Sequence, residues 1–132
     1  MTNPISLGPV HHLSLTVSDP ARSREFYTTI LGFQVIAELG PRLLLSNGNV
    51  LLGIGPGPER QYSNDRFDEN RVGLDHLSFS VNSRTELENA AQLLEDRGIP
   101  HGDIRDLSAL GISVMSFRDP DNIQLELTAP LG

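Results

Sequence analysis

Three residues of the chain have the types and the setting expected of metal ligands: His12, His76 and Glu126. Two neutral imidazoles and one carboxylate suit a divalent ion, and three protein ligands leave coordination positions open for water or substrate. A carboxylate that lines a cleft is costly to desolvate unless a cation compensates its charge. The residue types therefore predict one divalent metal ion, and they leave its identity (Fe, Mn, Zn, Ni, Co or Mg) open.

The two histidines occupy equivalent positions of an internal repeat. The segment 12–18 matches the segment 76–82 at an offset of 64 residues, with identical His, Leu, Ser and Val positions. A single histidine in a strand is more often a structural residue than a ligand. Its recurrence at the same strand position, together with an inward-facing glutamate, favours metal ligation.

Both repeated segments alternate apolar and polar residues, which is typical of a strand with one buried face. In the first strand, Leu13, Leu15 and Val17 are expected to face a helix. The polar side chains turned to the other face are then His12, Ser14 and Thr16 in the first strand, His76, Ser78 and Ser80 in the second, and Gln124, Glu126 and Thr128 in the last. The three candidate ligands meet if the sheets curve around a common cleft.

Each repeated strand leads into a helix. Asp19 is a good N-cap for the first helix, and Gly32 is placed to end it. Ser83 and Glu86 have the spacing of a capping box at the start of the second helix, and Gly98 closes it. The repeat unit therefore begins with a strand followed by a helix.

Strand-like segments complete each unit. They are 33–38, 42–46 and 49–54 in the first unit, with Asn47-Gly48 as a two-residue hairpin turn, and 112–118 and 123–128 in the second, joined by a turn at 119–122. The predicted class is α+β, with two βαβββ modules that form curved mixed sheets around a central cleft and carry their helices outside. One domain spans 1–132, with module one at about 9–55, a linker or mobile loop at about 56–72, and module two at about 73–129.

Composition excludes several other classes of protein. A net charge of −7 argues against nucleic acid as a partner, since phosphate binding needs a basic patch. No apolar run approaches the ~20 residues that span a bilayer, and the N-terminus does not resemble a secretory signal. With no Cys, a metal must be held by His and carboxylates. A cytoplasmic protein without a membrane partner is expected.

The paired motifs resemble those of the vicinal oxygen chelate superfamily. The resemblance lies in the segments 12–19, 26–33 and 117–127, and it extends from Val10 to Thr128. The superfamily includes glyoxalase I, fosfomycin-resistance and bleomycin-binding proteins, methylmalonyl-CoA epimerases and extradiol dioxygenases. The resemblance implies paired βαβββ modules, frequent dimerisation, and a metal bound by the first-strand His of each module and the last-strand Glu.

The chain departs from the best-known members of this superfamily. Glyoxalase I carries a fourth ligand, usually Glu, on the last strand of its first module, where the alignment of 52–54 with 125–127 places Gly53. Three ligands are closer to the fosfomycin-resistance and dioxygenase patterns. Fosfomycin-resistance proteins surround their anion with Lys and Arg, but this chain has no Lys. Extradiol dioxygenases place an extra His between the two ligand histidines, but no His lies between His12 and His76.

The leading functional hypothesis is a metal-dependent enzyme that acts on a small oxygenated molecule chelated through two adjacent oxygens. Lyase or isomerase chemistry by Lewis-acid catalysis is favoured, with Glu126 as a possible base and a homodimer as the expected assembly. The candidates to line the pocket are Ser14, Gly53, Ser78, Ser116 and Gln124. An Fe(II)-dependent extradiol-type dioxygenase and a non-catalytic small-molecule or antibiotic-binding protein remain open alternatives.

A few further side chains have two possible roles. His11 is expected at the strand edge or on the helix side, and His101 as a solvated loop residue or a mobile acid or base. Tyr62 and Phe67 either anchor the long loop or cover the cleft. Arg118 is expected to be an ion-pair or surface residue.

Overall fold

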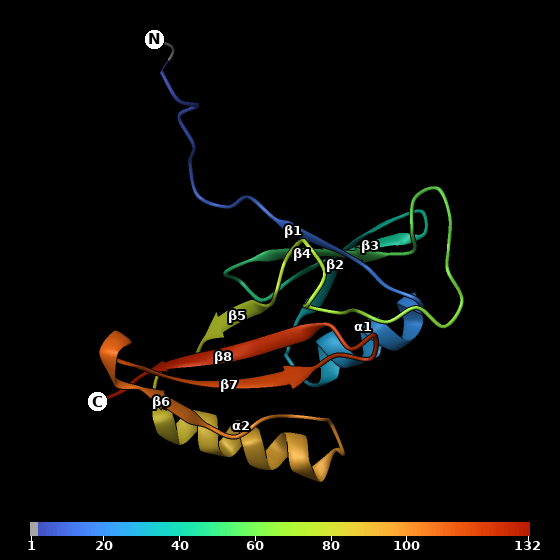
Figure 1. The fold of residues 1–132 in the computed structure, drawn as a ribbon. Coiled ribbons are helices and arrows are strands. Elements are labelled where there is room, and N and C mark those ends of the chain that lie inside the picture. Colours follow the sequence, from blue (N-terminus) through green and yellow to red (C-terminus); the bar gives the residue numbers. More distant parts are fainter. Residues whose placement is uncertain (1–2) are drawn as a thin grey trace. The chain divides into compact units, whose positions relative to one another are not determined.

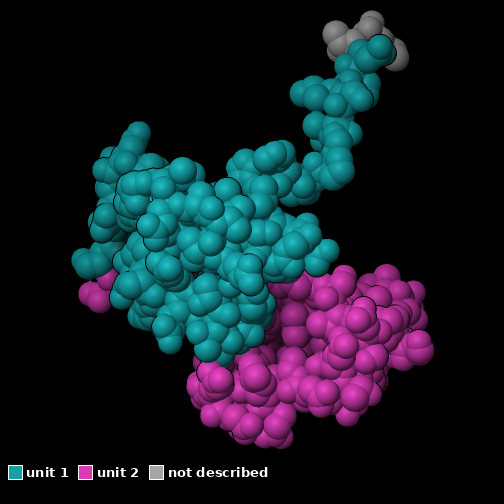
Figure 2. Space-filling model, turned by 180° about the vertical axis from the view of Figure 1, so that it is seen from behind, with its two compact units in different colours: residues 1–63 teal, residues 64–132 magenta. Residues whose placement is uncertain are grey.

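The computed structural model describes residues 3–132. The chain forms two compact units, residues 1–63 and 64–132, which Figure 2 shows in different colours. Among the described residues, each unit contains one α-helix and one four-stranded mixed sheet. The predicted α+β class and the repeated βαβββ order are confirmed.

The first unit contains β1 (Leu13–Thr16), α1 (Pro20–Thr29), β2 (Gln34–Leu39), β3 (Arg42–Ser46) and β4 (Leu51–Gly55). The strand order in its sheet is β1-β4-β3-β2 (Figure 1). Strands β1 and β4 are parallel, because α1 and the β2–β3 hairpin lie between them in the chain, and the other pairs are antiparallel.

The second unit contains β5 (Leu77–Ser80), α2 (Arg84–Asp96), β6 (Arg105–Leu107), a short 3-10 helix η1 (Ser108–Leu110), β7 (Ile112–Arg118) and β8 (Gln124–Pro130). Its order, β5-β8-β7-β6, repeats that of the first sheet. The alternation of residues did not reveal β6, because this edge strand has only three residues and two of them are charged.

The register of the strands supports the alignment of the two units. Ser14 of β1 pairs with Gly53 of β4, and Ser78 of β5 pairs with Glu126 of β8. Gly53 and Glu126 therefore hold the same place in their sheets. The chain lacks a side chain in the first unit where the second unit carries its glutamate.

Helix α1 begins and ends at the residues that its sequence suggests. The carboxylate of Asp19 accepts the backbone N–H of Arg22 at 3.3 Å. Phe26 and Tyr27 are buried towards the sheet. Gly32, with φ of +74°, turns the chain away in the left-handed conformation that favours glycine.

Helix α2 has its own capping network. The hydroxyl of Ser83 accepts the backbone N–H of Glu86 at 3.3 Å, and the carboxylate of Glu86 accepts the N–H of Asn82 at 2.8 Å. Leu87 and Leu94 are the buried residues of the helix. The helix packs against β7 and β8, so that one face of this sheet is apolar and covered.

Burial alternates along β8 as the sequence predicts. Leu125 and Leu127 of β8 are buried, whereas Glu126 between them is half-buried on the other face. In the first unit, Leu52 and Ile54 of β4 are fully buried beside α1. Each sheet therefore has one apolar face against its helix and one polar face available for chemistry.

The predicted two-residue hairpin turn at Asn47-Gly48 is wrong. Ser46 pairs with Leu51, so the loop between β3 and β4 has four residues, 47–50. The side-chain oxygen of Asn47 accepts the backbone N–H groups of Asn49 and Val50, both at 2.9 Å. This side-chain turn satisfies amides that a tighter hairpin would have paired across the strands.

The segment that leads into β5 is tied to the turn between β7 and β8. The backbone N–H of Phe67 donates to the carbonyl of Asp121 at 2.9 Å, and the amide of Asn122 donates to the carbonyl of Phe67 at 3.0 Å. Phe67 is therefore an anchor within the second unit. Tyr62, by contrast, is 63% exposed. Among residues 3–132, no helix is long and apolar enough to cross a membrane.

Candidate metal centre

Two of the three predicted ligands lie side by side in the second unit. Glu126 projects from the middle of β8, and His76 directly precedes β5, one residue before the strand that was expected to contain it. The Nε2 atom of His76 lies 3.6 Å from Oε1 of Glu126. Their side chains are 39% and 20% exposed, so that solvent and small molecules reach both.

This spacing fits two ligands of one cation. Metal–nitrogen and metal–oxygen bonds of about 2.0–2.2 Å place two neighbouring ligand atoms roughly 3–3.5 Å apart. The observed 3.6 Å is within about a tenth of an ångström of that range. A neutral imidazole nitrogen and a carboxylate oxygen are also the donor types that Mn, Fe, Co, Ni and Zn accept.

Asp75 orients the imidazole of His76. Its carboxylate oxygen lies 2.8 Å from Nδ1 of His76. The side-chain amide of Gln124 donates to the same carboxylate at 2.8 Å and to the Asp75 carbonyl at 3.2 Å. A carboxylate on Nδ1 makes that nitrogen the donor and leaves the lone pair on Nε2, the arrangement common behind metal-bound histidines. Sequence reasoning missed Asp75; the signal was an acidic residue directly before a candidate ligand.

A chain of hydroxyl groups supports Glu126. Thr128 donates its hydroxyl hydrogen to Oε1 of Glu126 at 3.2 Å. Ser78 lies 2.6 Å from the Thr128 oxygen and supplies the hydrogen of that contact, since the Thr128 hydrogen is already used. Ser78 therefore acts on the carboxylate through Thr128 and has no direct contact with it.

Arg118 closes this polar network at its outer end. Its two terminal nitrogens donate to the two carboxylate oxygens of Glu69, each at 2.8 Å, and one also lies 3.5 Å from the Gln124 oxygen. The hydrogen bonds from Arg118 lower the pKa of Glu69 to about 2. Arg118 is thus an ion-pair residue, as expected, and it ties the segment before β5 to the polar face of β8.

His12 occupies the corresponding position of the first unit. It is exposed, directly precedes β1, and its Nδ1 lies 2.8 Å from Nδ1 of His11, with the two rings edge to face. His11 holds the repeat position of Asp75, so in both units the preceding residue engages Nδ1. Within the described part of the chain, 3–132, no three His, Asp or Glu side chains form a group that could hold an ion. The structure therefore brings together His76 and Glu126, and places His12 in the other unit.

The remaining pocket candidates fall into two groups. In the first unit, a Cβ atom added to Gly53 would lie 3.0 Å from the Ser14 hydroxyl, so this hydroxyl occupies the space beside the glycine. In the second unit, Ser116 pairs with Glu126 across β7 and β8. A Cβ atom on Gly102 would lie 3.0 Å from the Ser116 hydroxyl, so the loop before β6 passes close to it.

A model of the Glyoxalase/Bleomycin resistance protein/Dioxygenase superfamily matches residues 10–127. The chain belongs to this superfamily. The resemblance of the paired motifs is thereby confirmed, and the register of Gly53 and Glu126 describes how this superfamily member departs from a symmetric pair of units.

The similarity to known proteins covers nearly the whole chain. The protein YwkD of Bacillus subtilis (strain 168) is 35% identical over 128 residues, which are 92% of this chain and 96% of that protein. A glyoxylase/bleomycin resistance protein/dioxygenase domain from Frankia sp. EAN1pec is 33% identical, with a TM-score of 0.79 over 95% of this chain and 93% of that one. Lactoylglutathione lyase from Agrobacterium tumefaciens shares the fold, with a TM-score of 0.73 at 19% identity over 94% and 96% of the two chains.

His101 makes two side-chain contacts in the second unit. Its Nε2 lies 2.8 Å from the Glu95 carboxylate and its Nδ1 lies 2.9 Å from the Gly102 carbonyl. Both partners only accept hydrogen bonds, so both ring nitrogens must donate, which favours the imidazolium. The contacts with Gly102 and Glu95 accordingly raise the pKa of His101. Its role is to link α2 to the loop that precedes β6.

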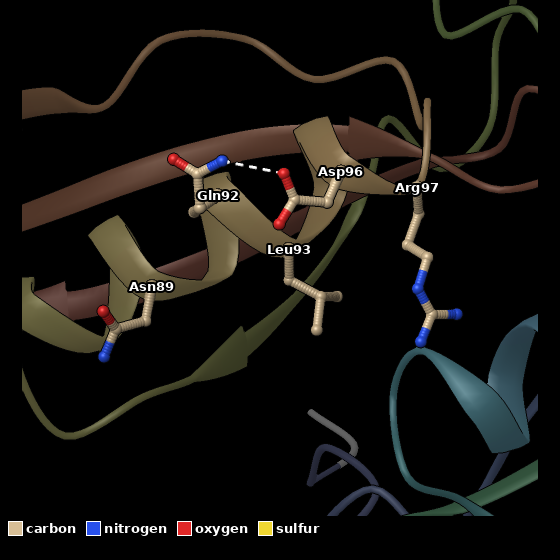
Figure 3. Close-up of a pocket in the computed structure, with 5 residues that line it drawn as sticks. All are labelled: Asn89, Gln92, Leu93, Asp96 and Arg97. Atoms are coloured by element: carbon tan, nitrogen blue, oxygen red, sulfur yellow. Dashed lines mark hydrogen bonds between the residues drawn. The ribbon is translucent and has the colours of Figure 1, made fainter.

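A hollow of about 410 Å³ lies along α2 in the second unit of the chain. Its lining residues all come from α2 or its C-cap: Asn89, Gln92, Leu93, Asp96 and Arg97. Figure 3 shows these side chains and the 2.9 Å hydrogen bond from Gln92 to Asp96. The hollow contains none of the candidate ligands or pocket residues, so it is separate from the polar face of β8.

Proposed function

We propose that the protein is a divalent-metal-dependent enzyme that acts on a small oxygenated organic substrate by lyase- or isomerase-type chemistry. The observation that carries the proposal is the pair of His76 Nε2 and Glu126 Oε1, 3.6 Å apart on a polar sheet face. Asp75 holds the other nitrogen of His76 at 2.8 Å, as a carboxylate does behind a metal-bound imidazole.

The proposed ligand set is His12, His76 and Glu126, with His12 contributed by the same chain or by a second copy in a homodimer. His12 joins the set because it holds the repeat position of His76 and because its Nδ1 is likewise engaged by the preceding residue. When bound, the ion would supply a Lewis acid that polarises two adjacent substrate oxygens. Gly53, at the place of a fourth ligand, offers the ion no side chain, so the proposed set has three protein ligands.

Glu126 has a second role in the proposal, as the base. Thr128 and Ser78 hold one of its oxygens through hydrogen bonds, and its side chain is 20% exposed. Its second oxygen can take a proton from the substrate carbon next to the polarised carbonyl and return it. The hydrogen bonds from Thr128 and Ser78 keep the Glu126 carboxyl group in one orientation while it takes up and returns the proton.

The comparisons support the reaction class only in outline. Superfamily membership is compatible with lyase, dioxygenase and resistance functions, and the Agrobacterium protein that shares this fold is named a lactoylglutathione lyase. Gly53 in place of a fourth ligand separates this chain from a four-ligand enzyme. We propose a cytoplasmic enzyme with a small, chelating 2-hydroxy or 2-oxo carbonyl compound as substrate.

Proton exchange tests the proposal without knowledge of the natural substrate. Hydroxyacetone, a small vicinal-oxygen chelator, is incubated in D₂O with protein loaded with Mg²⁺, Mn²⁺ or Zn²⁺, and loss of its α-protons is followed by NMR. The expected result is exchange faster than with metal-free protein or with metal-loaded His76→Ala. Equal rates in all three would contradict the proposal, and activity that needs Fe(II) and dioxygen would identify a dioxygenase instead.

A further inference from the structure

Arg42 lies across a part of the first sheet that has no side chains. Gly53 and Gly55 of β4 are both buried. They are two residues apart and therefore share one sheet face, which is the face that carries Ser14. A Cβ atom on Gly55 would lie 2.7 Å from Cγ and 3.0 Å from Nη1 of Arg42. The absence of a side chain at Gly55 therefore allows the arginine to lie flat on the polar face of β4.

The guanidinium of Arg42 is held by neutral oxygens alone. Nη2 donates to the Ser14 hydroxyl at 2.5 Å, and Nη1 donates to the Pro56 carbonyl at 3.3 Å. No carboxylate of the described residues, 3–132, pairs with it, although the chain has 17 acidic residues. A half-buried cation fixed by neutral acceptors keeps its full charge and several free donors in one plane.

Other arginines of the protein differ in this respect. Arg24, Arg84 and Arg118 each have a carboxylate oxygen within 3.3 Å. A guanidinium that is partly removed from water and lacks a counter-charge favours an anion from solution. Arg42 differs from these three arginines, because it is half-buried and held by neutral oxygens, and its charge is left for a ligand.

Arg42 lies on the sheet face of the first unit that corresponds, by strand register, to the face of Glu126 in the second unit. Its hydrogen-bond partner Ser14 lies in β1, two residues after His12, which directly precedes the strand. Gly53, beside Ser14, holds the register place that Glu126 holds in the second unit. The first unit therefore has a positive charge close to the register place that carries a glutamate in the second unit.

We propose that Arg42 is a substrate-binding residue that recognises a carboxylate, and that the substrate class is small organic acids with two further adjacent oxygens. The part of this inference that concerns the chelated oxygens rests on the proposed function. The part that concerns the anion rests on Arg42, Ser14 and the two glycines alone. The planar guanidinium of Arg42 lies against the glycine strip, which is Gly53 and Gly55. In this setting it selects a planar carboxylate through two parallel hydrogen bonds.

Anion binding is tested first on the full-length protein without metal. Succinate and inorganic phosphate are titrated separately while the side-chain N–H signal of Arg42 and the amide of Ser14 are followed by NMR. Saturable shifts of both signals with succinate are expected, and they should be absent in Arg42→Gln. No shift, or the same shifts in Arg42→Gln, would overturn the inference; tighter binding of phosphate than of succinate would overturn the choice of a carboxylate.

The second test uses two chelators that differ only in charge. The monohydroxamate of succinic acid and butanohydroxamate both chelate metal through two adjacent oxygens, but only the first carries a carboxylate. Metal-loaded wild-type protein is expected to bind the charged compound at least about tenfold more tightly, since only its carboxylate accepts hydrogen bonds from the Arg42 guanidinium. Arg42→Gln should lose this preference and keep its affinity for butanohydroxamate.

The failures of the two proposals are distinguishable. If neither hydroxamate binds loaded protein, the proposed metal function fails, and the metal-free succinate titration still decides the role of Arg42. If both bind wild-type protein equally, the role of Arg42 fails while the metal function stands.

Two further variants test whether the preference for the charged hydroxamate depends on Arg42 and on how its side chain is held. Arg24→Gln removes the same charge from an exposed ion pair with Glu38 and should leave the preference unchanged. Gly55→Ala keeps the charge of Arg42 but places a methyl group 2.7 Å from its Cγ, so that the side chain must move and the preference should fall. If Gly55→Ala still prefers the charged hydroxamate, the glycine strip does not determine the position of the Arg42 side chain.

Discussion

At the scale of single residues, the acidic group behind His76 determines how the imidazole is presented. Asp75 lies 2.8 Å from its Nδ1 and is itself held by Gln124, so the ring has one preferred orientation. We expect Asp75→Ala to weaken metal binding by about 10–100-fold, the usual effect of losing such a partner. Asp75→Asn, whose amide oxygen can still accept the Nδ1 hydrogen, should lose less.

Competition with a chromophoric chelator measures the metal affinity of the wild type and of the Asp75 variants. Asp96→Ala is the matched control, because Asp96 lies on α2 and contacts Gln92. Equal metal affinity in wild type and Asp75→Ala would mean that the ring orientation does not depend on this carboxylate.

His101 gives a prediction for pH dependence at the same scale. Its contacts with Gly102 and Glu95 raise its pKa above the ordinary value of 6.5, so the protonated form is the one that folding stabilises. This contribution is fully present below pH 6.5 and is lost as pH rises through the folded pKa. The stability difference between wild type and His101→Gln, from denaturant unfolding, should therefore be larger at about pH 5.5 than at about pH 9. A difference that grows with pH would contradict the assigned contacts.

At the scale of elements, the ion pair of Arg118 and Glu69 helps to hold the segment before β5. The hydrogen bonds from Arg118 lower the pKa of Glu69 from 4.5 to about 2, so their contribution to stability is present above pH 4.5 and is lost as pH falls towards about 2. Wild type should exceed Glu69→Gln in unfolding midpoint at neutral pH, and the two should converge over that acidic range. Parallel curves across that range would show that the ion pair does not hold the segment.

The strands that position the site were predictable because their alternation is strong. The pattern in 76–82 and 123–128 separated polar from apolar side chains, and the structure buries Leu125 and Leu127 on either side of Glu126 as expected. Strand β6 was not predictable, because two charged residues in a strand of three give no period. The Asx turn at Asn47 was also missed, since Asn-Gly is equally typical of a shorter loop.

The contacts that orient the candidate ligands were beyond the reach of sequence patterns. Asp75 and Gln124 are 49 residues apart, and their hydrogen bond depends on the path of the segment before β5. The pairing of Arg118 with Glu69 likewise depends on a loop without regular structure. Periodicity predicts which face a side chain takes, but it does not predict which irregular segment meets that face.

At the scale of the whole molecule, the proposed ion has ligands from both repeats, so it should stabilise the entire chain. A ligand present at about 100 times its dissociation constant adds about 2.7 kcal/mol to the free energy of unfolding. We expect this gain in the wild type and in His101→Gln, measured by thermal unfolding with and without metal. Both His12→Ala and His76→Ala should lose it. A full gain in His12→Ala would remove His12 from the ligand set.

The central claim is a single divalent ion held by His12, His76 and Glu126, and metal stoichiometry measures it most directly. Protein purified without added metal is stripped, titrated with Mn²⁺, Zn²⁺ and Fe²⁺, and analysed for bound ion per chain. We predict one equivalent in the wild type and in His101→Gln. Each of His12→Ala, His76→Ala and Glu126→Ala should bind more weakly by over about 100-fold, the upper end of the loss for supporting residues. Unchanged stoichiometry and affinity in any of the three would contradict the assignment.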